Sequence, residues 1–140
     1  MSNKIIKNRL QAVQAQLHKK GIDCLIITKP ANVTYTTGFS GEDSWAVITP
    51  RQIYLLTDSR YIEQAQNQCP QVRIIQYSGN KAAHKPISIT KAVAKLIGKL
   101  KSVRTVAVEN SSYLSDFIAL KKDVKTCLGK HKTSTLKVAT

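Results

Sequence analysis

The apolar residues of the chain follow a helical period in some segments and form short β-branched runs in others. Residues 3–20 carry one helical stripe, and residues 24–28 form a buried-strand pattern. The stripe has steps of four, three and four: Ile6, Leu10, Val13 and Leu17. The same two patterns predict the remaining elements, namely strands over 45–49, 53–57, 72–77, 104–109 and 124–128 and helices over 58–68, 89–100 and 113–120.

The alternation of strands and helices predicts a single α/β domain with helices packed on a central sheet. Only three residues separate the strands at 45–49 and 53–57, so this pair must be antiparallel and the sheet of about six strands must be mixed. Residues 78–80 are predicted to form a turn and 81–85 an exposed loop. We expect the domain to span 1–128, and residues 129–140, which lack a clear period, to be a flexible tail.

The densest local signals lie between residues 32 and 65. Gly38 and Gly41 bound a short loop, and we expect both at sharp turns, where glycine tolerates positive φ. Asp58 or Ser59 is in position to cap the following helix. These features predict a loop, a hairpin and a capped helix in that order.

The charge and cysteine content restrict the class of protein. Twenty-two basic against eight acidic residues give a net charge of +14, which would attract nucleic acid or another polyanion, although solvated lysines are the commoner explanation. Aromatic residues are only 6% of the chain, too few for an obvious base-stacking platform. The odd, scattered set of Cys24, Cys69 and Cys127, with no membrane-length apolar run and no export signal, predicts a cytoplasmic protein with reduced thiols.

No pattern in the sequence predicts catalysis by this chain. His18, His84 and His131 are not spaced with one another or with a carboxylate as metal ligands. Ser40 and Ser44 lie in the glycine loop but lack the spacing of a nucleophile elbow, so both are interpreted as turn residues. We therefore predict no catalytic residue and no metal site here.

Two segments carry a family resemblance: Thr37-Gly-Phe-Ser-Gly41 and, after the hairpin, Thr57-Asp-Ser-Arg-Tyr61-Ile-Glu-Gln-Ala65. Together they resemble the N-terminal domain of Xaa-Pro aminopeptidases and prolidases (the creatinase/prolidase family), closest to the aminopeptidase P branch. The resemblance implies a ribonuclease H-like mixed sheet. It also implies a parent enzyme that cleaves X-Pro peptide bonds with two divalent metal ions, often Mn²⁺. The family's metal ligands, two Asp, one His and two Glu, belong to a C-terminal catalytic domain absent from these residues.

The resemblance implies a non-catalytic role in homodimer contacts and active-site access. Phe39, Trp45, Arg60 and Tyr61 are the interface or gating candidates, whereas Gly38, Gly41 and Asp58 are expected to be structural. Trp45 as a core residue and Asp58–Arg60 as a purely structural pair remain open alternatives. Glu42-Asp43-Ser44-Trp45 replaces the small residues usual after the glycine motif, and no family connector follows residue 128. We expect this sequence to be either a piece of a longer protein or the product of a gene that ends early. The partners of the parent protein would be the missing catalytic domain and proline-containing peptides. The alternative function is a stand-alone basic module that binds nucleic acid or another polyanion.

Overall fold

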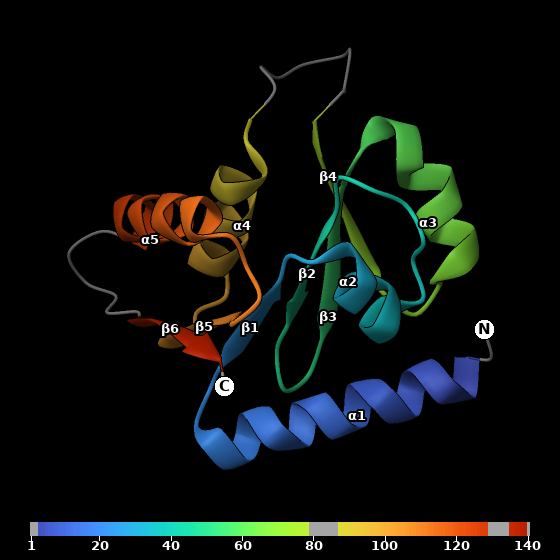
Figure 1. Ribbon diagram of the computed structural model, residues 1–140, viewed down its shortest axis with the longest axis horizontal. Coiled ribbons are helices and arrows are strands. Elements are labelled where there is room, and N and C mark those ends of the chain that lie inside the picture. Colours follow the sequence, from blue (N-terminus) through green and yellow to red (C-terminus); the bar gives the residue numbers. More distant parts are fainter. Residues whose placement is uncertain (1–2, 79–86, 129–134, 140) are drawn as a thin grey trace.

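The computed structural model describes residues 3–78, 87–128 and 135–139 of the chain (Figure 1). Five α-helices, one short 3₁₀-helix (η1) and six strands occur in these residues. In chain order they are α1 (Asn3–Lys20), β1 (Cys24–Ile27), α2 (Pro30–Thr37), β2 (Trp45–Ile48), β3 (Ile53–Asp58), η1 (Ser59–Tyr61), α3 (Ile62–Gln68), β4 (Arg73–Ser78), α4 (Ile89–Lys99), β5 (Thr105–Glu109), α5 (Leu114–Leu128) and β6 (Thr135–Ala139).

The six strands form one mixed sheet in the order β4-β3-β2-β1-β5-β6. Strand β2 is antiparallel to both of its neighbours, and the β1–β5, β5–β6 and β3–β4 pairs are parallel. The β2–β3 pair is the predicted hairpin, with Trp45 opposite Leu56 and Ile48 opposite Ile53. The predicted α/β fold with a mixed sheet is therefore confirmed.

Helices cover both faces of the sheet (Figure 1). Side chains of α4 and α5, such as Val93 and Leu120, pack with Ile26 of β1 on one face. Side chains of α1 and α3, such as Leu17 and Ala65, pack on the other face in a second cluster that includes the neighbouring Ile27. Because successive strand residues point to opposite faces, β1 contributes to both cores. The central strands are buried on both sides, which explains their continuous apolar runs.

The C-terminal part of the chain differs from the sequence prediction. Residues 124–128, predicted as a strand, are the last turns of α5, because Phe117, Leu120 and Val124 extend one helical stripe into the α4–α5 core. The sixth strand is β6 instead, within the segment predicted to be a flexible tail, and it pairs in parallel with β5. Leu136 and Val138 are the only large apolar residues of this strand, so its pattern is weaker than those of the predicted strands.

Some predictions fall outside the described residues. The loop predicted at 81–85 and the tail residues 129–134 and 140 belong to this group, as do His84 and His131. The turn predicted at 78–80 is described only at Ser78, the last residue of β4. Among the described helices, none combines the length and apolar character required to cross a membrane.

Candidate functional site

The glycine loop begins where α2 ends. Gly38 has φ +84°, and its N–H donates to the carbonyl oxygen of Thr34, so the predicted glycine turn is confirmed at this position. Gly41 does not have positive φ. It is needed for space, since a Cβ atom there would lie 2.2 Å from Cζ of Phe39 and 3.0 Å from Cδ1 of Tyr61. The residue with positive φ in this part of the loop is Asp43, at +51°, which an aspartate tolerates better than most residues.

Phe39 anchors the loop from inside. Its side chain is fully buried in the α1–α3 core, and its ring meets that of Tyr61 edge to face, with centroids 6.0 Å apart. Thr34 Oγ1 donates to the Phe39 carbonyl oxygen at 2.7 Å, and the Phe39 N–H donates to Thr37 Oγ1 at 3.0 Å. The position of the loop backbone is therefore fixed by one buried ring and its neighbours on α2.

Helix α3 holds the next residue of the loop. The Ser40 N–H donates to Gln68 Oε1 at 2.9 Å, and Gln68 Nε2 donates to Ser40 Oγ at 2.8 Å. Gln64, one turn earlier, donates to the same hydroxyl at 3.2 Å. Sequence reasoning missed these two glutamines. Their spacing of four residues on a predicted helix was the available signal, but nothing in it indicated Ser40 as the partner.

Asp58 and Arg60 form the charged part of the site. Asp58 Oδ1 accepts from the Arg60 N–H at 2.9 Å, which confirms the predicted helix cap. Arg60 Nε donates to both carboxylate oxygens at 3.1 Å, and Nη2 donates to Oδ2 at 2.6 Å. The same Nη2 reaches Asp43 Oδ2 at 2.9 Å, so one guanidinium joins the start of η1 to the glycine loop.

The contact with Arg60 shifts the pKa of Asp58. The hydrogen bonds from the Arg60 side chain lower the pKa of Asp58, and they outweigh its burial, which acts in the opposite direction. Tyr77 of β4 donates its hydroxyl hydrogen to the Asp43 carbonyl oxygen at 2.9 Å. Burial, followed by the nearby negative charges of Asp58 and Asp43, raises the pKa of Tyr77. Arg60 therefore favours the ionised form of Asp58, and the Tyr77 hydroxyl ties the backbone of Asp43 to the edge strand β4.

The four interface or gating candidates divide into buried and exposed pairs. Phe39 has no exposed surface and Trp45 only 8%, in the core beneath α4 and α5. The Arg60 side chain is 65% exposed, and Tyr61 beside it is half-buried, with the guanidinium carbon of Arg60 5.2 Å from its ring centroid. Phe39 and Trp45 are thus core residues that lie beneath the surface. The interface role of all four residues stays a prediction.

A second polar cluster escaped the sequence analysis. Glu109, at the end of β5, is only 8% exposed, and its Oε1 accepts from the N–H groups of Thr28 at 2.7 Å and Lys29 at 2.5 Å. Its Oε2 accepts from Asn32 Nδ2 at 2.6 Å. The carboxylate thus lies at the N-terminus of α2, where a negative charge is favourable. No short-range pattern links residues 28 and 109, so the sequence could not indicate this contact.

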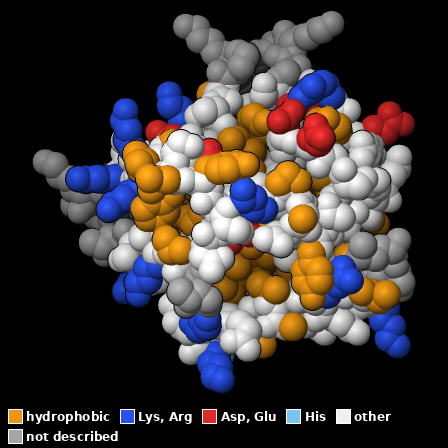
Figure 2. All heavy atoms as spheres, in the orientation of Figure 1, with side chains coloured by type: hydrophobic (Ala, Val, Ile, Leu, Met, Phe, Trp, Pro, Cys, Tyr) orange, Lys and Arg blue, Asp and Glu red, His pale blue; other side chains and the backbone are white. Residues whose placement is uncertain are grey.

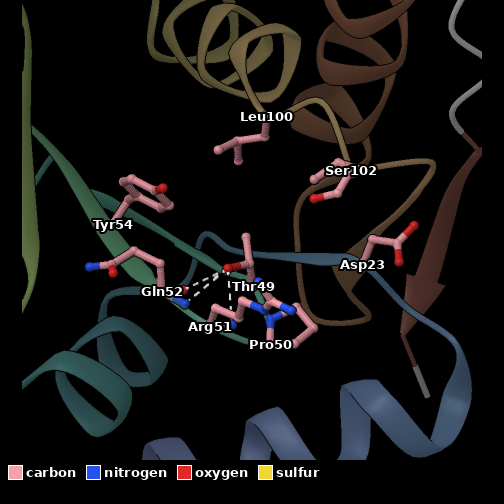
Figure 3. Close-up of a pocket in the computed structure, with 9 residues that line it drawn as sticks. Asp23, Thr49, Pro50, Arg51, Gln52, Tyr54, Leu100 and Ser102 are labelled. Atoms are coloured by element: carbon pink, nitrogen blue, oxygen red, sulfur yellow. Dashed lines mark hydrogen bonds between the residues drawn. The ribbon is translucent and has the colours of Figure 1, made fainter.

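A pocket of about 260 Å³ lies at the hairpin turn, the end of β2 and β3 remote from the glycine loop (Figure 3). Asp23 Oδ2 accepts from the N–H groups of Arg104 and Thr105, each at 2.9 Å. Thr49 Oγ1 accepts from the N–H of Gln52 at 3.0 Å, a bond that closes the turn. The carboxylate of Asp23 and the hydroxyl of Thr49 are therefore used in local structure.

Across 3–78, 87–128 and 135–139, no three His, Cys, Asp or Glu side chains gather in a way that could hold a metal ion. The two metal ions that the family resemblance implies thus have no fitting residues in this part of the chain. What the geometry shows at Arg60 is a partly exposed guanidinium held by the carboxylates of Asp58 and Asp43.

Comparisons with known proteins agree with this geometry. The family model described as the creatinase/prolidase N-terminal domain matches residues 9–134. The uncharacterized peptidase YqhT of Bacillus subtilis (strain 168) is 38% identical over 72 residues, which are 51% of this chain and 20% of that protein. Most of that peptidase therefore has no matched counterpart in this chain.

Solved structures share the fold over nearly the whole chain. An Xaa-Pro aminopeptidase from Streptococcus pyogenes matches with a TM-score of 0.74 and 25% identity, covering 96% of this chain and 95% of that one. The N-terminal domain of the cytoplasmic peptidase PepQ from Mycobacterium tuberculosis H37Rv matches with a TM-score of 0.74 and 24% identity, covering 94% and 93%. The likeness to PepQ is evidence for the fold alone.

Proposed function

The chain belongs to the creatinase/prolidase N-terminal domain family, and on this basis we propose that it serves a Xaa-Pro peptidase as a non-catalytic domain. The parent would hydrolyse the amide bond before proline in the cytoplasm. Two divalent metal ions, Mn²⁺ in the simplest case, would activate its water and polarise the carbonyl group. Those ions would be held by residues of a catalytic domain outside these 140 residues.

We further propose that the surface around Arg60 contacts a second subunit and limits access to the active site. The observation that carries this proposal is the fixed geometry of an exposed arginine. Both Asp58 oxygens and one Asp43 oxygen hold the guanidinium, yet 65% of the side chain faces solvent. Such a side chain loses little further conformational entropy on binding, which favours an interface contact.

Arg60 also retains donors for a partner. Its Nε and Nη2 bind the two aspartates, whereas Nη1 makes no hydrogen bond to any residue in the described ranges. A carbonyl or carboxylate oxygen of a second subunit could accept from Nη1 without breaking the cluster. Tyr61 would extend the contact with the half-buried ring beside it, and Phe39 and Trp45 would support the loop and hairpin from the core.

The test compares two arginine variants by sedimentation equilibrium. Arg60→Ala removes the proposed contact, and Arg51→Ala removes an exposed arginine from the hairpin turn at the other end of the strands. We expect the wild type and Arg51→Ala to self-associate alike, and Arg60→Ala to dissociate at least about tenfold more easily, as for an interface hot spot. Equal association of all three proteins would contradict the contact role of Arg60.

The non-catalytic role has a separate test. Purified chain supplied with Mn²⁺ and an X-Pro peptide should release no amino acid. Turnover that copurifies with the chain and disappears with a chelator would overturn this part of the proposal.

A further inference from the structure

Helix α4 carries a stripe of lysines on its exposed face. Lys91, Lys95 and Lys99 follow one another at steps of four residues, and all three are exposed, whereas Val93 and Leu96 between them are buried. With a rise of about 1.5 Å per residue, the stripe places one positive charge roughly every 6 Å over about 12 Å. It is a regular row of cations on one rigid element.

None of these three lysines forms an ion pair with an acidic residue in the part of the chain that the structure describes. The acidic groups nearby are engaged elsewhere: Asp123 of α5 accepts from Thr90 at 2.7 Å, and Asp43 and Asp58, near Tyr77, are bound by Arg60. Helix α4 contains no Asp or Glu, and every ion pair found among the described residues involves Arg60. Like charges four residues apart destabilise a helix by a few tenths of a kcal/mol per pair. In the face shown in Figure 2, Lys and Arg side chains lie mainly along the left and lower rim, whereas acidic side chains gather in the upper part. A polyanion on the stripe would relieve the repulsion within it.

A groove runs beside the stripe, between α4 and the edge strand β4. It encloses about 140 Å³, and Lys95 and Lys99 line it together with residues from β4 and the segment before α4. Those residues supply an aromatic ring, an amide and aliphatic side chains: Tyr77, Gln76, Ile75 and Ile87. Cations beside an apolar, aromatic-lined groove are the combination with which proteins hold single-stranded nucleic acid.

We propose that the α4 lysine stripe and this groove bind single-stranded nucleic acid. Consecutive phosphates lie along Lys91, Lys95 and Lys99, and one unpaired base enters the groove against Tyr77. Because one half-buried ring gives limited stacking, charge dominates the affinity and the binding has little sequence preference. An acidic peptide would satisfy the lysines but has no planar group for the groove. The proposal goes beyond the peptidase role and does not depend on it.

The test is fluorescence anisotropy with labelled oligothymidine at several salt concentrations. Three phosphate contacts on a single strand predict a slope of log K against log salt of about −2, or roughly a 20-fold loss of affinity between about 50 and 200 mM salt. No binding at the lowest salt would overturn the proposal.

Two triple variants separate a local site from overall charge. Lys91→Gln/Lys95→Gln/Lys99→Gln removes the stripe, and Lys4→Gln/Lys7→Gln/Lys19→Gln removes as many exposed lysines from α1. We expect the stripe variant to lose at least about tenfold in affinity and most of the salt slope, while the α1 variant stays within about twofold of wild type. Equal losses would overturn the proposal, since they would assign the binding to net charge.

A competitor identifies the class of ligand. Polyglutamate matched in charge to the oligothymidine should displace it poorly if a base occupies the groove. Displacement as effective as by unlabelled oligothymidine would overturn the nucleic-acid assignment and indicate an acidic protein segment instead.

Discussion

The carboxylate of Asp58 binds Arg60 in two ways at once. It accepts the Arg60 backbone N–H at 2.9 Å as a helix cap, and it accepts the guanidinium of the same residue at 2.6–3.1 Å as an ion pair. The first bond fixes the start of the helix and the second fixes the direction of its exposed side chain. The carboxylate of Asp58 thus sets the backbone at the start of η1 and also orients the Arg60 side chain proposed for the interface.

Replacing Asp58 by Asn should change how stability depends on pH. Arg60 lowers the pKa of Asp58 in the folded protein, so its stabilising effect is complete above the unfolded-state pKa of about 4 and is lost as pH falls through the lower folded pKa. We expect Asp58→Asn to lower the free energy of unfolding by about 1 kcal/mol near pH 7. The loss is modest because Arg60 is exposed.

The difference in the free energy of unfolding between the wild type and Asp58→Asn should shrink below about pH 4. Urea unfolding of both proteins across the acid range measures it. A difference that stays constant down to about pH 2 would show that the ionised carboxylate contributes nothing.

Replacing Gly41 by Ala should destabilise the domain through crowding. The new methyl group would lie 2.2 Å from Phe39 Cζ, so this fully buried ring or the loop backbone would have to shift. We expect a loss of about 1–3 kcal/mol in the free energy of unfolding, the usual cost of overpacking.

The matched control for that variant is Gly98→Ala. Gly98 lies in α4, and the nearest atom to its added methyl group would be 3.9 Å away. Because alanine favours a helix, this variant should be neutral or up to about 1 kcal/mol more stable. Thermal unfolding of both variants gives the comparison, and equal destabilisation would contradict the crowding argument.

Replacing Glu109 by Ala should weaken the connection between β5 and the start of α2. The substitution leaves the N–H groups of Thr28 and Lys29 without their acceptor in a largely buried site, at a cost of about 2–4 kcal/mol. The exposed Glu42→Ala variant should change stability by less than about 0.5 kcal/mol. A loss below about 1 kcal/mol for Glu109→Ala, measured by urea unfolding, would show that water replaces the carboxylate.

The three cysteines should react at very different rates. Burial raises the pKa of the Cys24 thiol to about 12 and that of Cys69 to about 11, whereas Cys127 is exposed on α5. We expect iodoacetamide at about pH 8 to modify Cys127 at least about 100-fold faster than the other two, since the thiolate is the reactive form. Mass spectrometry before and after adding urea counts the modified thiols. Rapid native labelling of a Cys127→Ser variant would contradict the burial.

The structural features that the sequence predicted correctly depend on residues close together in the chain. The hairpin, the Asp58 cap and the Gly38 turn each involve residues within a short segment, so spacing and residue type were sufficient. Gly41 was predicted at a turn for its φ, but the true reason is its contact with the Phe39 ring, which only the packed structure reveals.

Long-range contacts could not be predicted in this way. The bond between Asn32 and Glu109 and the position of β6 beside β5 both join segments with no shared pattern. Phe39 shows the same limit, because an aromatic residue in a glycine loop could equally face a partner or the core, and its complete burial follows from the arrangement of α1–α3. The Gln68–Ser40 contact belongs to this group as well.

The central position of β1 has a consequence for the order of folding. Strand β2 pairs with both β1 and β3, and the three strands are close together in the sequence, so they are synthesised one after another. The other edge of β1 pairs with β5, where Cys24 lies opposite Val106, and β5 is synthesised much later. Contacts between residues so far apart in the chain form slowly, because a long loop must close first. The sheet face that α4 and α5 cover therefore stays open to solvent until the last third of the chain has been synthesised. During that interval, apolar side chains that enter this core, such as Val47 and Leu56, are exposed on the nascent chain, and exposed apolar surface favours aggregation.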